Sequence, residues 1–214
     1  MWLNGLALVA FGAFGLFAVL QSVFGWQVRN EELALAGQAA DTYWHYLSTG
    51  HFGEAIFENW ESEFLQMGSY VLLTAYLVQR GSPDSKPLDG KDRAEDDPAK
   101  ATAASPRLSR TRGLLHLVYR NSLSLVLFAF FALSMVGHLL SGTAGYNEEQ
   151  ALENGAPPIT AWQFLGRPEF WYQSMQNWQS EFLAVGCLVV LGIVLRQHGS
   201  PESKPVTVPH DHTG

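Results

Sequence analysis

Cysteine and charged residues are both scarce in this chain of 214 residues. The single cysteine, Cys187, excludes an internal disulfide and a cysteine metal cluster. Charged residues make up 15% of the chain, whereas a soluble domain carries about 25%. The net charge of −7 argues against a nucleic-acid partner, because nucleic acid favours a basic protein surface. Ser/His/Asp, His-Glu-x-x-His and Gly-x-Gly-x-x-Gly patterns are also missing, so the sequence predicts no enzyme, no cofactor and no metal site.

Apolar residues, in contrast, are gathered into four blocks. The first block, 5–26, carries no charge, and the third, 121–140, carries no acidic or strongly basic side chain. About 20 apolar residues suffice to cross a bilayer, so both blocks predict spanning helices. A cleaved signal peptide is the alternative for the first block, but it predicts a basic start and a small-residue cleavage site, and the sequence has neither.

The second and fourth blocks are shorter and alone resemble buried helices of a soluble protein. Each block, however, is preceded by a tryptophan and closed by an arginine: Trp60 and Arg80 flank the second, and Trp178 and Arg196 flank the fourth. Aromatic and basic residues anchor helices at the two membrane interfaces. Counted from tryptophan to arginine, both blocks reach membrane length, so the sequence predicts four transmembrane helices in an all-α membrane protein.

The basic residues predict the orientation of these helices. Nine of the 13 lysines and arginines lie between positions 80 and 120, and the connections 27–59 and 141–177 hold one each. Basic residues are enriched in cytoplasmic loops of membrane proteins. We therefore expect the central stretch and both termini in the cytoplasm, and the two connections outside.

Two motifs occur twice in the sequence. Asn-Trp-x-Ser-Glu-Phe-Leu starts at Asn59 and again at Asn177, and Gly-Ser-Pro-x-Ser-Lys-Pro starts at Gly81 and again at Gly199. Both pairs are separated by 118 positions, and the first apolar block matches the third at a separation of 117. The sequence therefore predicts a tandem duplication of a two-helix hairpin, with both copies in the same orientation.

The duplication also predicts how the chain is divided. We expect the two hairpin repeats at 1–87 and 114–205. The stretch 88–113 is rich in proline, aspartate, lysine, alanine and serine, which indicates a disordered cytoplasmic linker. The residues 206–214 are expected to form a disordered tail.

The two outer connections mix aromatic with polar residues, which predicts short amphipathic helices on the outer leaflet. Pro168 suits the first turn of a helix that continues into the fourth span. The aromatic segments lie at 42–47, 52–57, 161–165 and 170–172.

The Asn-Trp-x-Ser-Glu motif carries the candidate functional site. Glu63 lies about 25 Å along a helix from Arg80, which places it near the outer boundary of a hydrocarbon core about 30 Å thick. An ionisable residue at this depth is a hypothesis of function, and two such carboxylates can hold a cation or pass a proton. The alternative is structural, with glutamate near a helix N-terminus and with asparagine and serine capping the helix or bonding to its neighbours. The candidate residues are Asn59, Ser62, Glu63, Asn177, Ser180 and Glu181.

The Gly-Ser-Pro-x-Ser-Lys-Pro motif closes the same helices. Glycine commonly follows the last helical turn, and proline then blocks continuation. Lys86 and Lys204 are expected at the level of anionic lipid headgroups. We interpret the motif as a helix stop with a lipid contact, and a specific anion or partner site is the alternative. His138 and its repeat partner Gln21 are expected to hydrogen-bond between helices rather than to bind metal or haem.

The paired motifs resemble those of an uncharacterised family of small bacterial integral membrane proteins, a domain of unknown function rich in WQSEFL and RGSPESKP strings. The resemblance covers most of the chain outside the linker. The first copy departs from the second at Glu61, where the second has Gln179, and at Asp84, where it has Glu202. The resemblance implies a protein of the bacterial inner membrane and no established activity.

The sequence thus favours a non-enzymatic structural or accessory component of the membrane. Its partners would be the lipid bilayer and either another membrane protein or further copies of the chain. The alternative is a small channel or transporter for a cation or proton that uses Glu63 and Glu181.

Overall fold

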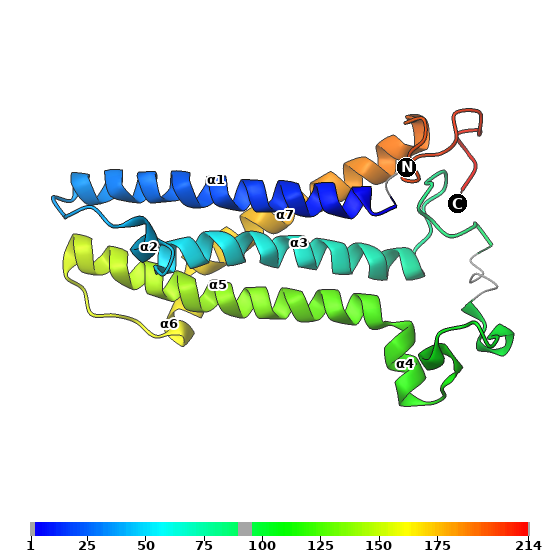
Figure 1. Ribbon diagram of the computed structural model, residues 1–214, viewed down its shortest axis with the longest axis horizontal. Coiled ribbons are helices and arrows are strands. Elements are labelled where there is room, and N and C mark those ends of the chain that lie inside the picture. The colour runs from blue at the N-terminus through cyan, green and yellow to red at the C-terminus, as the bar shows by residue number, and fades with distance from the viewer. Residues whose placement is uncertain (1–2, 90–95, 214) are drawn as a thin grey trace. The chain divides into compact units, whose positions relative to one another are not determined.

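The computed structural model describes residues 3–89 and 96–213, without the side chains of 152–154. All regular elements within these ranges are helical, and seven of them are α-helices (Figure 1). Two short 3₁₀ helices lie between α3 and α4. The bounds are α1 Gly5–Leu35, α2 Tyr43–Tyr46, α3 Gly50–Tyr76, η2 Pro98–Lys100, η3 Arg107–Arg110, α4 Leu114–Arg120, α5 Ser122–Asn154, α6 Ala161–Leu165 and α7 Pro168–Val194.

Three helices are long and apolar enough to cross a membrane: α1, α5 over 122–151, and α7. Their apolar side chains point outward, as Leu6, Phe11 and Leu183 illustrate. Soluble monomers rarely expose contiguous apolar surface of this kind. Three of the four predicted spans therefore correspond to helices that suit a bilayer.

The second predicted span lies in α3, which does not reach the apolarity of the other three helices. Its 27 residues are sufficient in length, but four glutamates lie along its first part and lower its mean hydropathy. They are Glu54, Glu58, Glu61 and Glu63.

The helix boundaries correct several sequence predictions. Helices α1 and α5 continue well past the predicted ends at residues 26 and 140. The segment 52–57 is not a separate surface helix but the first part of α3, because no proline interrupts the chain before the apolar block. Likewise, 170–172 belongs to α7, which starts at Pro168 as predicted. Helices α3 and α7 end at Tyr76 and Val194, before the predicted arginines.

The contacts within the chain define two compact units. The first unit contains 1–59 and 134–172, and the second contains 60–133 and 173–214, so α3, α5 and α7 each contribute to both. The predicted repeat boundaries stay a prediction. Of the predicted linker and tail, residues 90–95 and 214 lie outside the described residues.

Close helix contact through small residues holds the first unit together. Gly50 of α3 lies directly against the α5 backbone around Gly145, and Gly53 lies against Ser141. Gly137 of α5 accommodates the ring of Phe57. Small residues allow helices of membrane proteins to approach closely, where packing and interhelical hydrogen bonds replace the hydrophobic effect.

An aromatic core lies beneath α6 in the same unit. Phe164 and Phe170 are fully buried with ring centroids 5.9 Å apart, and His138 is fully buried with its ring 4.7 Å from that of Phe170. Gln21, the repeat partner of His138, donates from α1 to the Ala55 carbonyl of α3 at 3.4 Å, which is the interhelical bond expected for it.

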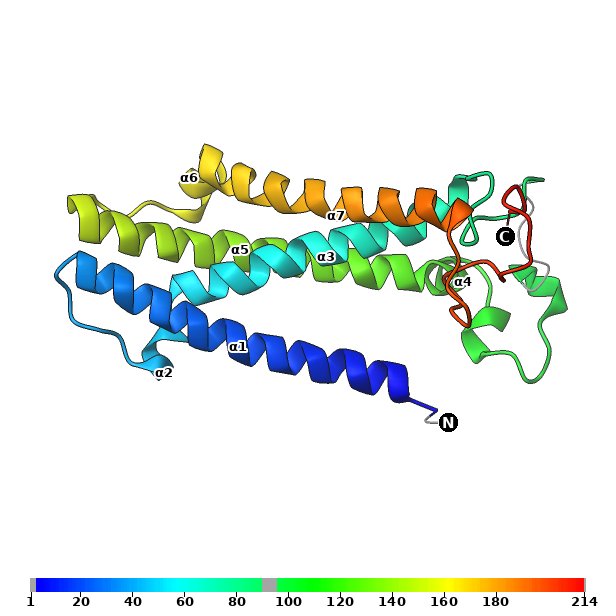
Figure 2. The ribbon, with the colours of Figure 1, turned by 90° about the horizontal axis from the view of Figure 1, so that it is seen from above.

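The short helix α2 is fixed beside α1, and the two views of Figures 1 and 2 agree on this position. Asn30 clasps the backbone of Asp41: its Oδ1 accepts from the Asp41 N–H at 2.7 Å, and its Nδ2 donates to the Asp41 carbonyl at 3.3 Å. The Trp26 indole also donates to the Asp41 carbonyl. Thr42 then caps α2 by accepting from the His45 N–H. The connection is therefore an ordered structure.

The connection to α6 repeats this arrangement. Asn147 accepts from the Ile159 N–H at 2.8 Å and donates to its carbonyl at 3.0 Å. Thr160 caps α6 in a capping box with Gln163, which satisfies two otherwise unpaired backbone N–H groups. Asn30 and Asn147, 117 positions apart in the sequence, thus make the same pair of bonds.

Candidate functional site

Three of the six candidate residues of the Asn-Trp-x-Ser-Glu motif donate hydrogen bonds to backbone carbonyls of their own helix. Asn59 donates to the Ala55 carbonyl at 2.7 Å, and Asn177 donates to the Gln173 carbonyl at 3.3 Å. Ser180 donates to the Asn177 carbonyl at 2.8 Å. They are local bonds, as the structural alternative expects, but the motif begins only at the tenth residue of both α3 and α7, so neither asparagine caps a helix and the glutamates do not lie near a helix N-terminus.

The structure brings the two candidate glutamates into electrostatic range of each other. Glu63 of α3 is exposed and Glu181 of α7 is half-buried, both within the second unit. Two carboxylates at this range repel each other when both are ionised, and that repulsion weakens when a cation or proton is shared. Their role as an ion site stays a prediction.

The buried carboxylate of the motif is Glu61, which sequence reasoning did not select. Glu61 is fully buried, and its Oε1 accepts from the Trp178 indole Nε1–H at 2.9 Å. Phe131 packs edge-on against Trp178, and Ser62 beside Glu61 is also buried. A buried carboxylate is costly unless it is hydrogen-bonded. The hydrogen bond from the Trp178 indole therefore lowers the cost of burying the Glu61 carboxylate.

The first Gly-Ser-Pro-x-Ser-Lys-Pro motif forms a hydrogen-bonded turn after α3. Gly81 has φ +82°, a conformation that favours glycine. The Ser85 hydroxyl accepts from the Gln79 N–H at 2.9 Å and donates to the Lys86 carbonyl at 3.2 Å. The motif therefore folds the chain back on itself after α3 ends.

The second copy forms the same turn after α7. Gly199 has φ +83°, and Ser203 accepts from the Gln197 N–H at 2.8 Å and donates to the Lys204 carbonyl at 3.2 Å. The two lysines differ: Lys204 is buried with its Nζ on the His210 carbonyl at 2.7 Å, whereas Lys86 lines a cavity. Their contacts with lipid headgroups stay a prediction.

A second polar cluster surrounds Arg29 in the first unit. The buried guanidinium lies 3.1 Å from His51 Nε2, 3.6 Å from Glu148 and 3.9 Å from Glu32. Tyr46 is buried nearby, and burial raises the pKa of its hydroxyl, as does the negative charge of Glu32, while Arg29 opposes the shift. The acidic partners compensate the buried cation, so this cluster stabilises the C-terminal end of α1.

Comparison with known proteins gives one match. A family described as a domain of unknown function, DUF6766, matches residues 1–214. The chain belongs to this family. The predicted resemblance to a domain of unknown function is thereby confirmed. No curated protein and no solved structure matches the DUF6766 chain, so its role has to be argued from the geometry.

Sequence reasoning on this DUF6766 chain missed Glu61 and Arg29 for the same reason. The sequence shows only the segment in which each residue lies, whereas the burial of each side chain depends on which helix packs against it. A signal for Glu61 was present, because it is acidic where the second repeat carries Gln179. A signal for Arg29 was that it is the one lysine or arginine of the connection 27–59. Among the residues that the structure describes, no group of three or more His, Cys, Asp or Glu is placed to hold a metal.

Proposed function

We propose that this DUF6766 chain is a non-enzymatic accessory component of the bacterial inner membrane that uses α2 and α6 to bind a membrane-protein partner. The observation that carries the proposal is a pair of tryptophans on these two short helices. Trp44 is 78% exposed on α2, and Trp162 is 81% exposed on α6. They are 118 positions apart, the separation of the repeated motifs.

The rigidity of both helices supports a binding role. Each is held by an asparagine clasp and a threonine cap, so each tryptophan is presented on an ordered backbone. Tryptophan offers a large apolar surface with a polar N–H, and it is enriched among residues that dominate protein interfaces. Ordering in advance lowers the entropic cost of binding.

The proposal also includes four transmembrane helices, with α3 as the second of them, and both termini in the cytoplasm. The polarity of α3 is compatible with a membrane because Glu61 and Ser62 are buried and Glu61 is hydrogen-bonded to Trp178. Charged groups inside membranes are tolerated when they face the protein and are paired. The recurring turns and asparagine clasps support the duplication of a two-helix hairpin.

Site-specific photocrosslinking tests the accessory role. A photoreactive amino acid placed at Trp44 or at Trp162 in growing cells should give the same discrete crosslinked product, identifiable by mass. Position 38, exposed in the same connection but outside α2, provides the control and should give none. Lipid adducts alone at both tryptophans would contradict a protein partner and assign α2 and α6 to the membrane interface.

A transport role is the second candidate, because Glu63 and Glu181 are near enough to interact. On our proposal, proteoliposomes with the wild-type chain should pass protons and monovalent cations no faster than empty liposomes. The opposite result would be ion flux through the wild-type chain. The double variant Glu63→Gln with Glu181→Gln would abolish this flux, and the exposed control Glu169→Gln would leave it intact. That result would replace the accessory role with transport.

A further inference from the structure

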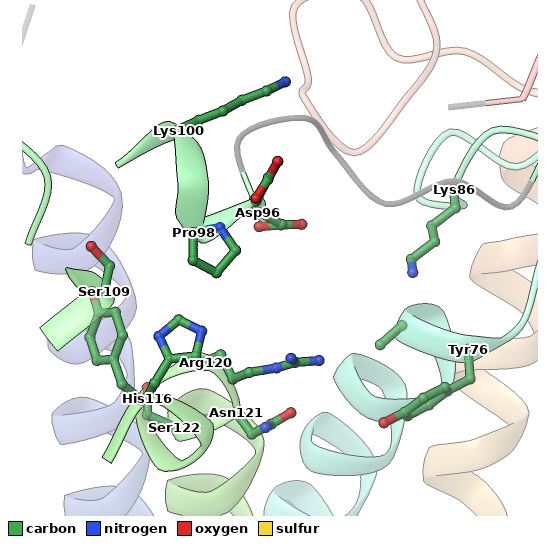
Figure 3. A pocket seen from close by; sticks show the side chains of 13 residues that line it. Tyr76, Lys86, Asp96, Pro98, Lys100, Ser109, His116, Arg120, Asn121 and Ser122 are labelled. Atoms are coloured by element: carbon green, nitrogen blue, oxygen red, sulfur yellow. The ribbon is translucent and has the colours of Figure 1, made fainter. Parts of the chain in front are cut away.

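A cavity of about 910 Å³ opens in the second unit where α3 ends and α5 begins (Figure 3). The described residues that line it come from the end of α3, the loop with Lys86, η2, η3, α4 and the first residue of α5. The lining therefore combines the ends of two long helices with the basic stretch between them. Its titratable nitrogen and carboxylate groups belong to Lys86, Lys100, His116, Arg120, Asp96 and Asp97.

Two cationic side chains converge in this cavity. Figure 3 shows Lys86 and Arg120 pointing toward one another, Lys86 from the loop after α3 and Arg120 from the end of α4. The Tyr76 hydroxyl points into the same space from α3. Like charges that face each other repel, and an anion between them converts that repulsion into attraction.

Two carboxylates, those of Asp96 and Asp97, line the same cavity from the side of η2. The Asp97 carboxylate accepts from the Ala99 N–H at 2.9 Å and so caps η2. Asp96 lies on the side of Lys100 in Figure 3, across the cavity from Arg120. The described lining therefore carries three basic side chains, those of Lys86, Lys100 and Arg120, against two carboxylates.

The cavity also has a defined place along the helices. Asn121 and Ser122 line the cavity at the N-terminus of α5, which is long and apolar enough to cross a membrane. The N–H groups at a helix N-terminus favour an anion. Tyr76 and Tyr119 line the same cavity, and tyrosine is typical of the membrane–water interface. If α5 spans the membrane, the cavity lies at headgroup level.

We propose that this cavity binds the phosphate group of an anionic ligand, with Lys86 and Arg120 as its principal contacts. The inference rests on the proposed transmembrane orientation, which places the cavity on the cytoplasmic face. Guanidinium donates two parallel hydrogen bonds to phosphate oxygens, and lysine adds a compact charge. An anionic phospholipid headgroup and free phosphate share this chemistry.

Binding of a fluorescent short-chain phosphatidylglycerol to the full chain in phosphatidylcholine nanodiscs tests the proposal. Lys86→Gln with Arg120→Gln should weaken binding about thirtyfold. Each basic residue near an anionic headgroup strengthens binding about fivefold, and the two factors multiply. Arg107→Gln with Arg110→Gln removes the same charge from two η3 residues that do not line the cavity, although Ser109 between them does, and should change binding little. Arg120→Lys keeps the charge without the fork and should give an intermediate loss.

Titration with inorganic phosphate in the same nanodiscs distinguishes the two sources. Saturable phosphate binding that the double variant loses would assign the site to a soluble anion, and binding of phosphatidylglycerol alone would assign it to lipid. If neither probe binds, or if the η3 variant loses as much as the cavity variant, the proposal is wrong. The orientation has its own test, a cysteine placed by Ser105→Cys in a Cys187→Ala background. If a thiol reagent that stays outside intact cells labels this cysteine, the proposed orientation is wrong, and the binding result still stands.

Discussion

Replacing Gly50 with alanine should destabilise the chain by at least about 3 kcal/mol, the upper end of the cost of overpacking a well-filled interior. A Cβ atom at Gly50 would meet the backbone nitrogen of Gly145 and would lie 2.7 Å from both the Ala144 carbonyl carbon and the Ser141 carbonyl oxygen. These are backbone atoms, so no side-chain rotation relieves the contact. Within the first unit, α3 and α5 would have to separate. The thermal unfolding midpoint in mild detergent measures the effect.

Glycines without such neighbours provide the matched controls for Gly50→Ala. A Cβ atom at Gly12 of α1 or at Gly186 of α7 would meet nothing within 4 Å. Alanine at those helical positions should be neutral or should stabilise by up to about 1 kcal/mol, because it restricts the unfolded chain. Gly53→Ala should fall between these cases, because its Cβ would lie 2.8 Å from the side chain of Ser141. Equal midpoints for Gly50→Ala and Gly12→Ala would show that the two helices do not pack as described.

The features of the fold that could be predicted from the sequence depend only on residues that lie close together along the chain. Apolar length identified α1, α5 and α7 as helices that suit a bilayer, and the proline at residue 168 marked the start of α7. The aromatic segments around Trp44 and Trp162 became short helices, α2 and α6. Each of these features follows from local composition or from a capping residue, so no knowledge of the packing was needed.

The parts that the sequence did not predict depend on which face of a helix meets another helix. Glu61 and Glu63 are two residues apart, which places them about 200° apart around the helix axis. The motif alone does not tell which of these faces is buried, and we chose Glu63, whereas the structure buries Glu61. The same limit applies to Gly50, whose importance comes from the α5 backbone about 95 positions along the chain.

The differences between the two repeats acquire a physical reason in the structure. Glu61 is buried and bonded to Trp178, whereas its counterpart Gln179 is exposed and donates to a carbonyl of its own helix. Lys204 is committed to a protein carbonyl, whereas Lys86 faces a cavity. Matching positions of the two motif copies thus have different surroundings, which gives a physical reason for their different side chains.

The pairing of Glu61 with Trp178 should be measurable as a coupling between the two side chains. Glu61→Ala removes the acceptor of a buried indole N–H and leaves a void, and together these should cost about 2–4 kcal/mol. Glu61→Gln keeps an acceptor oxygen and should cost less. Gln179→Ala, at the exposed counterpart position, should change the unfolding midpoint little.

A double-mutant cycle separates this bond from general damage to the packing. Trp178→Phe keeps an aromatic ring against Phe131 and removes the N–H donor. If the hydrogen bond is present, Glu61→Ala should cost less in the Trp178→Phe background than in the wild type, with a coupling free energy of about 0.5–3 kcal/mol, the range for residues in direct contact. Additive effects would contradict the bond. They would also remove the reason why α3 tolerates a buried carboxylate, and with it the main support for α3 as the second span.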